Sequence, residues 1–162
     1  MTKLNLGCSI YKFFDFINID SDPNVQPDML LDLKDLATKF APESIDFINL
    51  GHVLEHMPYE DSLNLLNDCC TILKPFASML AIVPNYEIAA KLLPWKEAER
   101  VIISDGEHKQ IFNDQKLYDL FKQSKFSYFY NIGLDNIPYM IVSNNLDPKP
   151  DPWQSTMLAI KY

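Results

Sequence analysis

Basic residues and long apolar runs are both scarce in this sequence. Lys and Arg total 14 against 22 Asp and Glu, which gives a net charge of -8. Such a chain has no broad positive field, so we expect no general binding to nucleic acid and none to a membrane surface. No apolar run approaches the roughly 18 residues of a membrane-spanning helix, and no signal-peptide segment precedes the first strand pattern. These absences predict a cytoplasmic protein.

Cysteine is also rare, with three residues at Cys8, Cys69 and Cys70. The count is odd and two of the three are adjacent, which is a poor arrangement for disulfides and agrees with a reducing compartment. None of them has the spacing of a metal-ligand set. We therefore expect neither a disulfide framework nor a metal bound through cysteine.

Apolar residues, in contrast, are sufficient for one complete core. Of the 162 residues, 48% are hydrophobic and 12% aromatic, the content of a single domain over residues 1–162. Segments 59–73 and 113–124 have the apolar periodicity of helices, with Asn113 as the expected N-cap of the second. Short apolar runs alternate with them and predict strands at 4–7, 16–20, 29–31, 45–50, 79–83, 126–132 and 157–160.

This alternation predicts an α/β fold, a Rossmann-like doubly wound sheet of about seven mostly parallel strands. The runs are too apolar for a sheet with one wet face, so we expect cover on both faces. Segment 144–152 carries three prolines and predicts a stiff loop between the last two strands, not a domain boundary.

The predicted ligand site lies where parallel strands end, because such sheets bind ligands at their carboxyl edge. Gly7 would let a ligand approach the backbone, and Asp20 could accept both hydroxyls of a ribose. Asp32 with Leu33 could flank an adenine. Each also has a plainer interpretation: Gly7 as a turn, Asp20 as a strand-end cap, and Asp32 as an N-cap for residues 34–40.

The first turn indicates which adenosine cofactor fits. A dinucleotide site needs a second glycine and a helix that receives the pyrophosphate. Here Ser9 replaces that glycine, and the 13 positions from Gly7 to Asp20 leave room for barely one helical turn. A nucleoside without phosphates, such as S-adenosylmethionine (SAM), fits better.

Taken together, these features make the sequence resemble the class I SAM-dependent methyltransferases and, among them, the small "methyltransferase type 11" group. The resemblance covers nearly the whole chain and rests on Lys3-Leu4-Asn5-Leu6-Gly7-Cys8, Asn18-Ile19-Asp20, Pro27-Asp28, Asp32-Leu33, Ser44-Ile45-Asp46-Phe47-Ile48, His52-Val53-Leu54-Glu55-His56, Leu73-Lys74-Pro75 and Gly106-Glu107-His108-Lys109.

The resemblance implies the strand order 3-2-1-4-5-7-6 with the last strand antiparallel, and methyl transfer by direct displacement. It implies a cofactor site lined by Gly7, Cys8, Ser9, Asp20, Asp32, Leu33 and Gly51. The family usually has glycines where this chain has Ser9 and Phe76-Ala77, so we expect a tighter or differently shaped cofactor turn.

His52-Val53-Leu54-Glu55-His56 also fits the HxxEH pattern of zinc hydrolases, which needs both histidines on one helix face. A preceding strand and the following Pro58 disagree with a metal-bearing helix. We therefore expect no metal site, a His56 that hydrogen-bonds locally to fix the turn, and a His52 that faces the acceptor.

Methyl transfer to a hydroxyl or amine needs alignment of the reactants and a general base. The candidates are His52 and His108, with Glu55 behind them. Trp153 and Tyr139 either wall an acceptor pocket or belong to the core, and Trp95 is expected in the core. Residues 138–140 and the proline loop are the candidate lid.

The sequence thus predicts a SAM-dependent methyltransferase for a small-molecule or glycan acceptor. The alternatives are a degenerate domain of the same fold that serves in binding or as a structural domain without turnover and, less favoured, a zinc hydrolase. Only two residues precede Lys3, so the cofactor site is expected to be open. Whether a homo-oligomer covers it is left undecided by the sequence.

Overall fold

The computed structural model describes residues 1–132 and 153–162, in which seven strands form one sheet. The strands are β1 (Lys3–Leu6), β2 (Ile17–Asp20), β3 (Met29–Leu30), β4 (Ile45–Gly51), β5 (Leu73–Pro84), β6 (Tyr128–Asn131) and β7 (Gln154–Ile160). Their order is β3-β2-β1-β4-β5-β7-β6. β1 to β5 pair in parallel, and β7 runs antiparallel to both β5 and β6. The predicted Rossmann-like sheet and its strand order are confirmed.

The helices also follow the sequence pattern where that pattern was strong. They are α1 (Leu36–Lys39), α2 (Tyr59–Ile72), α3 (Tyr86–Leu92), α4 (Trp95–Ile103) and α5 (Asp114–Gln123), with 3-10 turns η1 (Pro23–Val25), η2 (Leu33–Asp35), η3 (Leu54–His56) and η4 (Ser104–Gly106). α5 begins as predicted, because the Asn113 side chain accepts a hydrogen bond from the Lys116 amide at 2.8 Å. Within the described ranges, no helix has the length and apolar content needed to cross a membrane.

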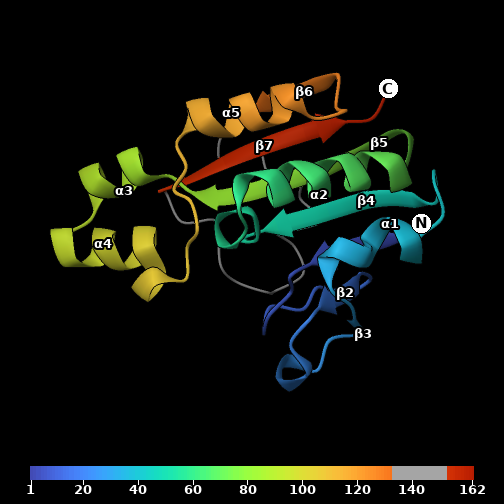
Figure 1. The fold of residues 1–162 in the computed structure, drawn as a ribbon, viewed down its shortest axis with the longest axis horizontal. Coiled ribbons are helices and arrows are strands. Elements are labelled where there is room, and N and C mark those ends of the chain that lie inside the picture. Colours follow the sequence, from blue (N-terminus) through green and yellow to red (C-terminus); the bar gives the residue numbers. More distant parts are fainter. Residues whose placement is uncertain (133–152) are drawn as a thin grey trace.

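Successive side chains of the central strands enter two separate cores, as the two-residue period of a strand requires. Ile48 and Leu50 of β4 pack into the larger core together with α1, α2 and α5. Phe47 points the other way and packs with Phe16, Leu80 and Ile82. Figure 1 shows α1, α2 and α5 lying over the same face of the sheet.

The expected cover on both faces is corrected in one respect: the described residues place no helix on the second face. There, loop residues Phe13 and Phe16 pack against Phe47. The reason is chain length. Residues 7–16 and 21–28 connect the parallel pairs β1–β2 and β2–β3, and eight to ten residues are fewer than a helical crossover normally uses.

α3 and α4, which the sequence pattern did not indicate, lie together beyond the carboxyl end of β5 (Figure 1). They lead the chain through η4 into residues 107–113, which return to the edge of the sheet. Tyr86 and Phe112 join there through a backbone hydrogen bond of 2.9 Å. This excursion brings His108 back to the end of β4.

Candidate functional site

The first turn of the chain is held at the end of β1 by tight packing. Gly7 has a φ of 63°, and a Cβ at this position would lie 2.5 Å from Cγ2 of the buried Val53. Ser9 adopts a φ of 45°, so it keeps the left-handed backbone that glycine favours. Phe76 does the same with a φ of 64°. Ser9 and Phe76, two of the three positions where the resemblance expects glycine, thus retain a glycine-like backbone, whereas Ala77 does not.

Asp20 closes the turn from the neighbouring strand. Its Oδ2 accepts from the Ser9 amide at 2.8 Å, and its Oδ1 accepts from the Asp22 amide at 3.0 Å. Both hydrogen bonds are exposed to solvent. Because each carboxylate oxygen has a second acceptor position, Asp20 can still receive two hydroxyls from outside. Asp20 is thus both the strand-end cap and an open acceptor.

Cys8 lies between Gly7 and Ser9 in this turn and is buried. Its amide donates to the carbonyl of Ile19 at 3.0 Å and so fixes the turn to β2. Burial, and next the carboxylate of Asp20, raise the pKa of the Cys8 thiol. The thiol is therefore neutral and unreactive at physiological pH, and only the backbone of Cys8 is available to a ligand.

The other predicted cofactor residues lie at the ends of adjacent strands. Asp32 caps η2, since its Oδ1 accepts from the Lys34 amide at 3.0 Å, and Leu33 packs partly against the larger core. Gly51 ends β4 beside β1. The plainer interpretation of Asp32 as an N-cap is thus confirmed, and the residue is exposed to solvent.

A chain of buried asparagines that the predictions missed supports this edge. Asn49 donates to Asn5 at 2.8 Å, Asn5 donates to Asn18 at 3.0 Å, and Asn18 donates to Asp28 at 2.7 Å. The three asparagines lie side by side on β4, β1 and β2. Each of these asparagines interrupts a different apolar run, and this signal could have identified the three residues from the sequence. They hold the strands in register below the Gly7–Ser9 turn.

His52 follows β4 in a left-handed conformation, with a φ of 56°. Its Nε2 is 2.7 Å from Nε2 of Gln154, and its Nδ1 is 3.0 Å from Oε1 of Glu55. The Gln154 nitrogen can only donate, so Nε2 of His52 accepts and Nδ1 carries the hydrogen given to Glu55. Both ring nitrogens of His52 are therefore engaged. Gln154 could not be found from sequence, since it lies 102 positions away.

His108 lies in the loop after α4, and its ring is oriented by the backbone. Its Nδ1 is 2.7 Å from the carbonyl oxygen of Ile102, an acceptor only, so Nδ1 donates. In the neutral form of this ring, Nε2 of His108 therefore carries the lone pair. Of the two predicted catalytic histidines, His108 is the one with a ring nitrogen free to act as a base within the described structure.

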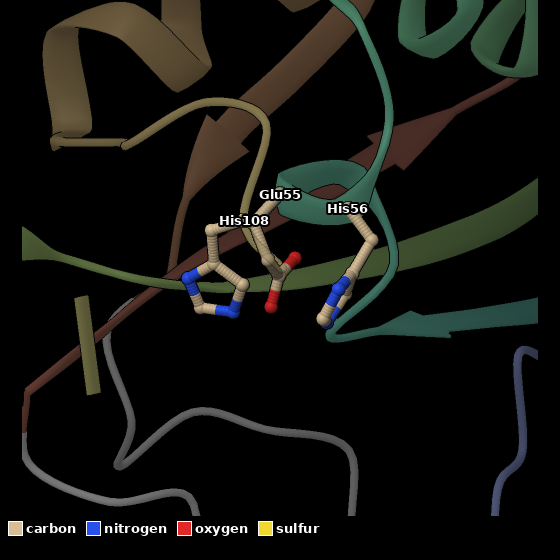
Figure 2. Close-up of side chains that lie close together, drawn as sticks. All are labelled: Glu55, His56 and His108. Atoms are coloured by element: carbon tan, nitrogen blue, oxygen red, sulfur yellow. The ribbon is translucent and has the colours of Figure 1, made fainter. Parts of the chain in front are cut away.

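The structure brings His108 together with Glu55 and His56, not with His52. One ligand atom from each of the three side chains lies within 4.8 Å of the other two. The rings of His56 and His108 meet edge to face with centroids 4.7 Å apart. Figure 2 shows the three side chains pointing the same way, with Glu55 and His56 from η3 and His108 from the facing loop.

The HxxEH segment is a 3-10 turn in this structure, so His52 and His56 do not share a helix face. The His56 amide does bond locally, to the carbonyl of Val53 at 3.1 Å. Its ring has no hydrogen-bond partner in residues 1–132 and 153–162. The ring that fixes the turn is that of His52, through Glu55.

The structure places the two described tryptophans, Trp95 and Trp153, in different surroundings. Trp95 is 73% exposed at the first turn of α4, so its expected place in the core is wrong. α4 buries Ala98 instead. The rings of Trp153 and His52 meet edge to face with centroids 6.3 Å apart, so Trp153 lies beside the candidate site at His52. Tyr139, residues 138–140 and the proline loop at 144–152 fall outside the described residues, Pro152 included.

Comparison with known proteins gives structural similarity without sequence similarity. No family model matches the chain, and no curated protein matches it. A SAM-dependent methyltransferase from Archaeoglobus fulgidus is 15% identical, with a TM-score of 0.71 over 99% of this chain and 86% of that one. The chain has the fold of the SAM-dependent methyltransferases.

Two further solved structures of this fold support the same conclusion. A SAM-dependent methyltransferase from Thermotoga maritima is 12% identical, with a TM-score of 0.65 over 99% of this chain and 82% of that one. The Burkholderia thailandensis 1,6-didemethyltoxoflavin-N1-methyltransferase, solved with its substrate and S-adenosylhomocysteine, is 13% identical, with a TM-score of 0.59 over 99% of this chain and 70% of that one. At these identities the comparison shows a shared methyltransferase fold.

Proposed function

We propose that this chain is a SAM-dependent methyltransferase that acts in the cytoplasm on a small-molecule or glycan acceptor. The observation that carries the proposal is the placement of Asp20 against the Gly7–Ser9 turn, at the carboxyl edge of a methyltransferase fold. A carboxylate open to solvent at the end of the second strand suits a ribose diol. The short turn beside it has no helix N-terminus for a pyrophosphate.

The residues at this edge fit the cofactor in charge and in chemistry. Asp20 would hold the ribose, the backbone of residues 7–9 would line the methionine end, and Asp32 with Leu33 would flank the adenine. When bound, the cofactor supplies an electrophilic methyl group on a sulfonium. The protein's task is then to align an acceptor atom with that methyl carbon, which supplies much of the rate enhancement.

Proton removal from the acceptor is assigned to the histidines at the end of β4. Nε2 of His108 holds a lone pair and can accept a proton, whereas Nε2 of His52 already accepts from Gln154. We therefore assign His108 as the general base and His52 as a group that positions Glu55.

Thermal melting with SAM or S-adenosylhomocysteine tests the proposal. A ligand at 100 times its dissociation constant adds about 2.7 kcal/mol to the free energy of unfolding. For a domain of this size, that corresponds to a rise in Tm of roughly 5–10 °C. The Asp20→Ala variant should lose this rise, because the ribose loses its acceptor.

Asp22→Ala is the matched control, since it removes an exposed carboxylate two residues away that only caps η1. It should keep the ligand-induced rise in Tm. If neither ligand raises the Tm of the unmodified protein, the methyltransferase proposal is wrong and the alternative of a domain without turnover is favoured. An equal rise in Asp20→Ala would contradict only the ribose assignment.

A further inference from the structure

The cluster of Glu55, His56 and His108 contains one buried group for which residues 1–132 and 153–162 provide no partner. Glu55 is 1% exposed, and its Oε2 has no hydrogen-bond partner in the described part of the chain. A buried carboxylate oxygen without a partner is strongly destabilising, and such oxygens in native proteins usually contact a cation or a water. Glu55 also lines a small cavity together with His108 and Gln110.

The free lone pairs of the two histidines face the same space as this carboxylate. Nδ1 of His108 donates to a backbone carbonyl, which leaves Nε2 with its lone pair. The ring of His56 is exposed and has no hydrogen-bond partner among the described residues. Metal-binding histidines typically donate their second ring nitrogen to a carbonyl or carboxylate, and His108 is arranged in this way.

The Glu55 carboxylate is also held by an outer hydrogen bond, as the His108 ring is. Its Oε1 accepts from Nδ1 of His52, and His52 is in turn held by Gln154. The hydrogen-bonded chain from Gln154 through His52 fixes the carboxylate and leaves only Oε2 for another partner. A ligating carboxylate is usually held by such an outer hydrogen bond.

The backbone fixes the two halves of the cluster to each other. The amides of Lys109 and Gln110 both donate to the carbonyl of Glu55, at 2.7 and 3.2 Å. The Gln110 side chain donates to the carbonyls of Leu54 and Met57, at 3.0 and 3.1 Å. The loop that carries His108 is therefore bound to the turn that carries Glu55 and His56, and the cluster is largely formed in advance.

We propose that Glu55, His56 and His108 bind a divalent first-row transition cation, with Zn²⁺ as the reference ion. Two imidazoles and one carboxylate are a ligand set suited to such cations. Their ligand atoms lie within 4.8 Å of one another, against about 3.4 Å around a tetrahedral Zn²⁺ with bonds near 2.1 Å. Small rotations of the three side chains, of which His56 is the exposed one, can close this difference. The site departs from HxxEH, because His108 replaces His52 as the second imidazole.

Three protein ligands leave coordination positions open, as in metal sites that bind substrates. This part of the inference rests on the proposed methyltransferase function. The acceptor class is then one with an oxygen ligand, such as a hydroxyl next to a second oxygen. The cation lowers the pKa of the bound hydroxyl, whose proton passes to solvent while its oxygen forms the new bond to the methyl carbon and the carbon–sulfur bond breaks. While the cation is bound, Nε2 of His108 is its ligand, and the role of His108 as the base proposed above applies to the chain without the cation.

Co²⁺ and Zn²⁺ titrations of the purified, chelator-treated full chain test the site without any cofactor. We expect one ion per chain by elemental analysis, a rise in Tm, and visible d–d absorption with Co²⁺. Glu55→Gln, His56→Ala and His108→Ala should each weaken binding by about 100-fold or more, since even outer hydrogen-bond partners contribute 10- to 100-fold. His56 is exposed, so its removal should leave the fold intact.

Asp20→Ala is the control, because it removes a carboxylate at the cofactor edge and should leave Co²⁺ binding unchanged. His56→Ala should in turn retain the rise in Tm with S-adenosylhomocysteine, so failure of the metal site and failure of the cofactor site are distinguishable. Absence of a bound ion in the unmodified chain would overturn the proposal. So would Co²⁺ spectra and affinities in His56→Ala and His108→Ala that equal those of the unmodified chain.

Discussion

Gly7 provides the sharpest test of how the cofactor turn is built. Two separate effects act against any side chain at this position. A non-glycine residue in the left-handed region raises the free energy by about 1–2 kcal/mol. In addition, a Cβ would lie 2.5 Å from Cγ2 of Val53, which is buried and stiff about χ1, so relief of this contact should require a further shift of about 1–3 kcal/mol. Gly7→Ala should therefore lower the free energy of unfolding by roughly 2–5 kcal/mol.

Two other glycines of the chain separate these effects. Gly106 has a φ of 90° but no atom within 4 Å of an added Cβ, so Gly106→Ala should show only the backbone effect of about 1–2 kcal/mol. Gly51 has no positive φ, and its Cβ would make an ordinary contact of 3.5 Å with Asn49. Gly51→Ala should be neutral or stabilising by up to about 1 kcal/mol.

Urea unfolding followed by circular dichroism measures all three variants, and a double-mutant cycle isolates the contact. Val53→Ala alone should lose about 2 kcal/mol through two buried methyl groups and the space they leave. In Gly7→Ala/Val53→Ala the collision is gone, so the double variant should be about 1–3 kcal/mol more stable than the sum of the single effects predicts. Additive effects, or equal losses in Gly7→Ala and Gly106→Ala, would refute the packing argument.

Two further predictions concern the same edge of the sheet. Ser9→Gly should stabilise the chain by up to about 1 kcal/mol in urea unfolding, because it relieves the left-handed backbone of Ser9, and a loss of stability would contradict this. Hydrogen bonds from the amide and side chain of Asn18 lower the pKa of Asp28 below its ordinary 3.8. A carboxyl whose pKa is lower in the folded state stabilises the fold above pH 4 and loses this effect as the pH falls through its folded value. Asp28→Asn should therefore show a shallower loss of stability between pH 5 and 2, and an unchanged acid limb would rule out this role.

Much of the fold could be predicted because its signals are local. Most strands contain a short apolar run that a polar or glycine residue ends or follows, and the buried stripes of α2 and α5 recur with the helical period. Strand order came from a resemblance, because local patterns do not show which strands are neighbours. The missing helices of the second face were predictable from length alone, since 7–16 and 21–28 are too short for helical crossovers.

The candidate site also has residues that local sequence patterns placed correctly and residues that they did not. Gly7 and Asp20 follow their strands directly, so sequence placed them together. Trp95 was misplaced because a large aromatic residue is usually buried, whereas helix α4 buries its small Ala98 and leaves the ring outside. The ring orientations of His52 and His108 depend on Gln154 and on the carbonyl of Ile102, which no local pattern indicates.

The sequence by itself determined the strands, the two main helices, the short Gly7–Ser9 turn without a helix to receive a pyrophosphate, and the Asp20 carboxylate that closes this turn. These features depend on neighbours within one turn or one strand, where the period of the backbone fixes which side chains meet. Only the tertiary structure decided which histidine has a free nitrogen and which partners Glu55 receives. His108 lies 53 positions from Glu55, and Gln154 lies 102 from His52. Contacts at such distances are set by how the elements pack, because a periodic pattern specifies that a face is buried but not what it packs against.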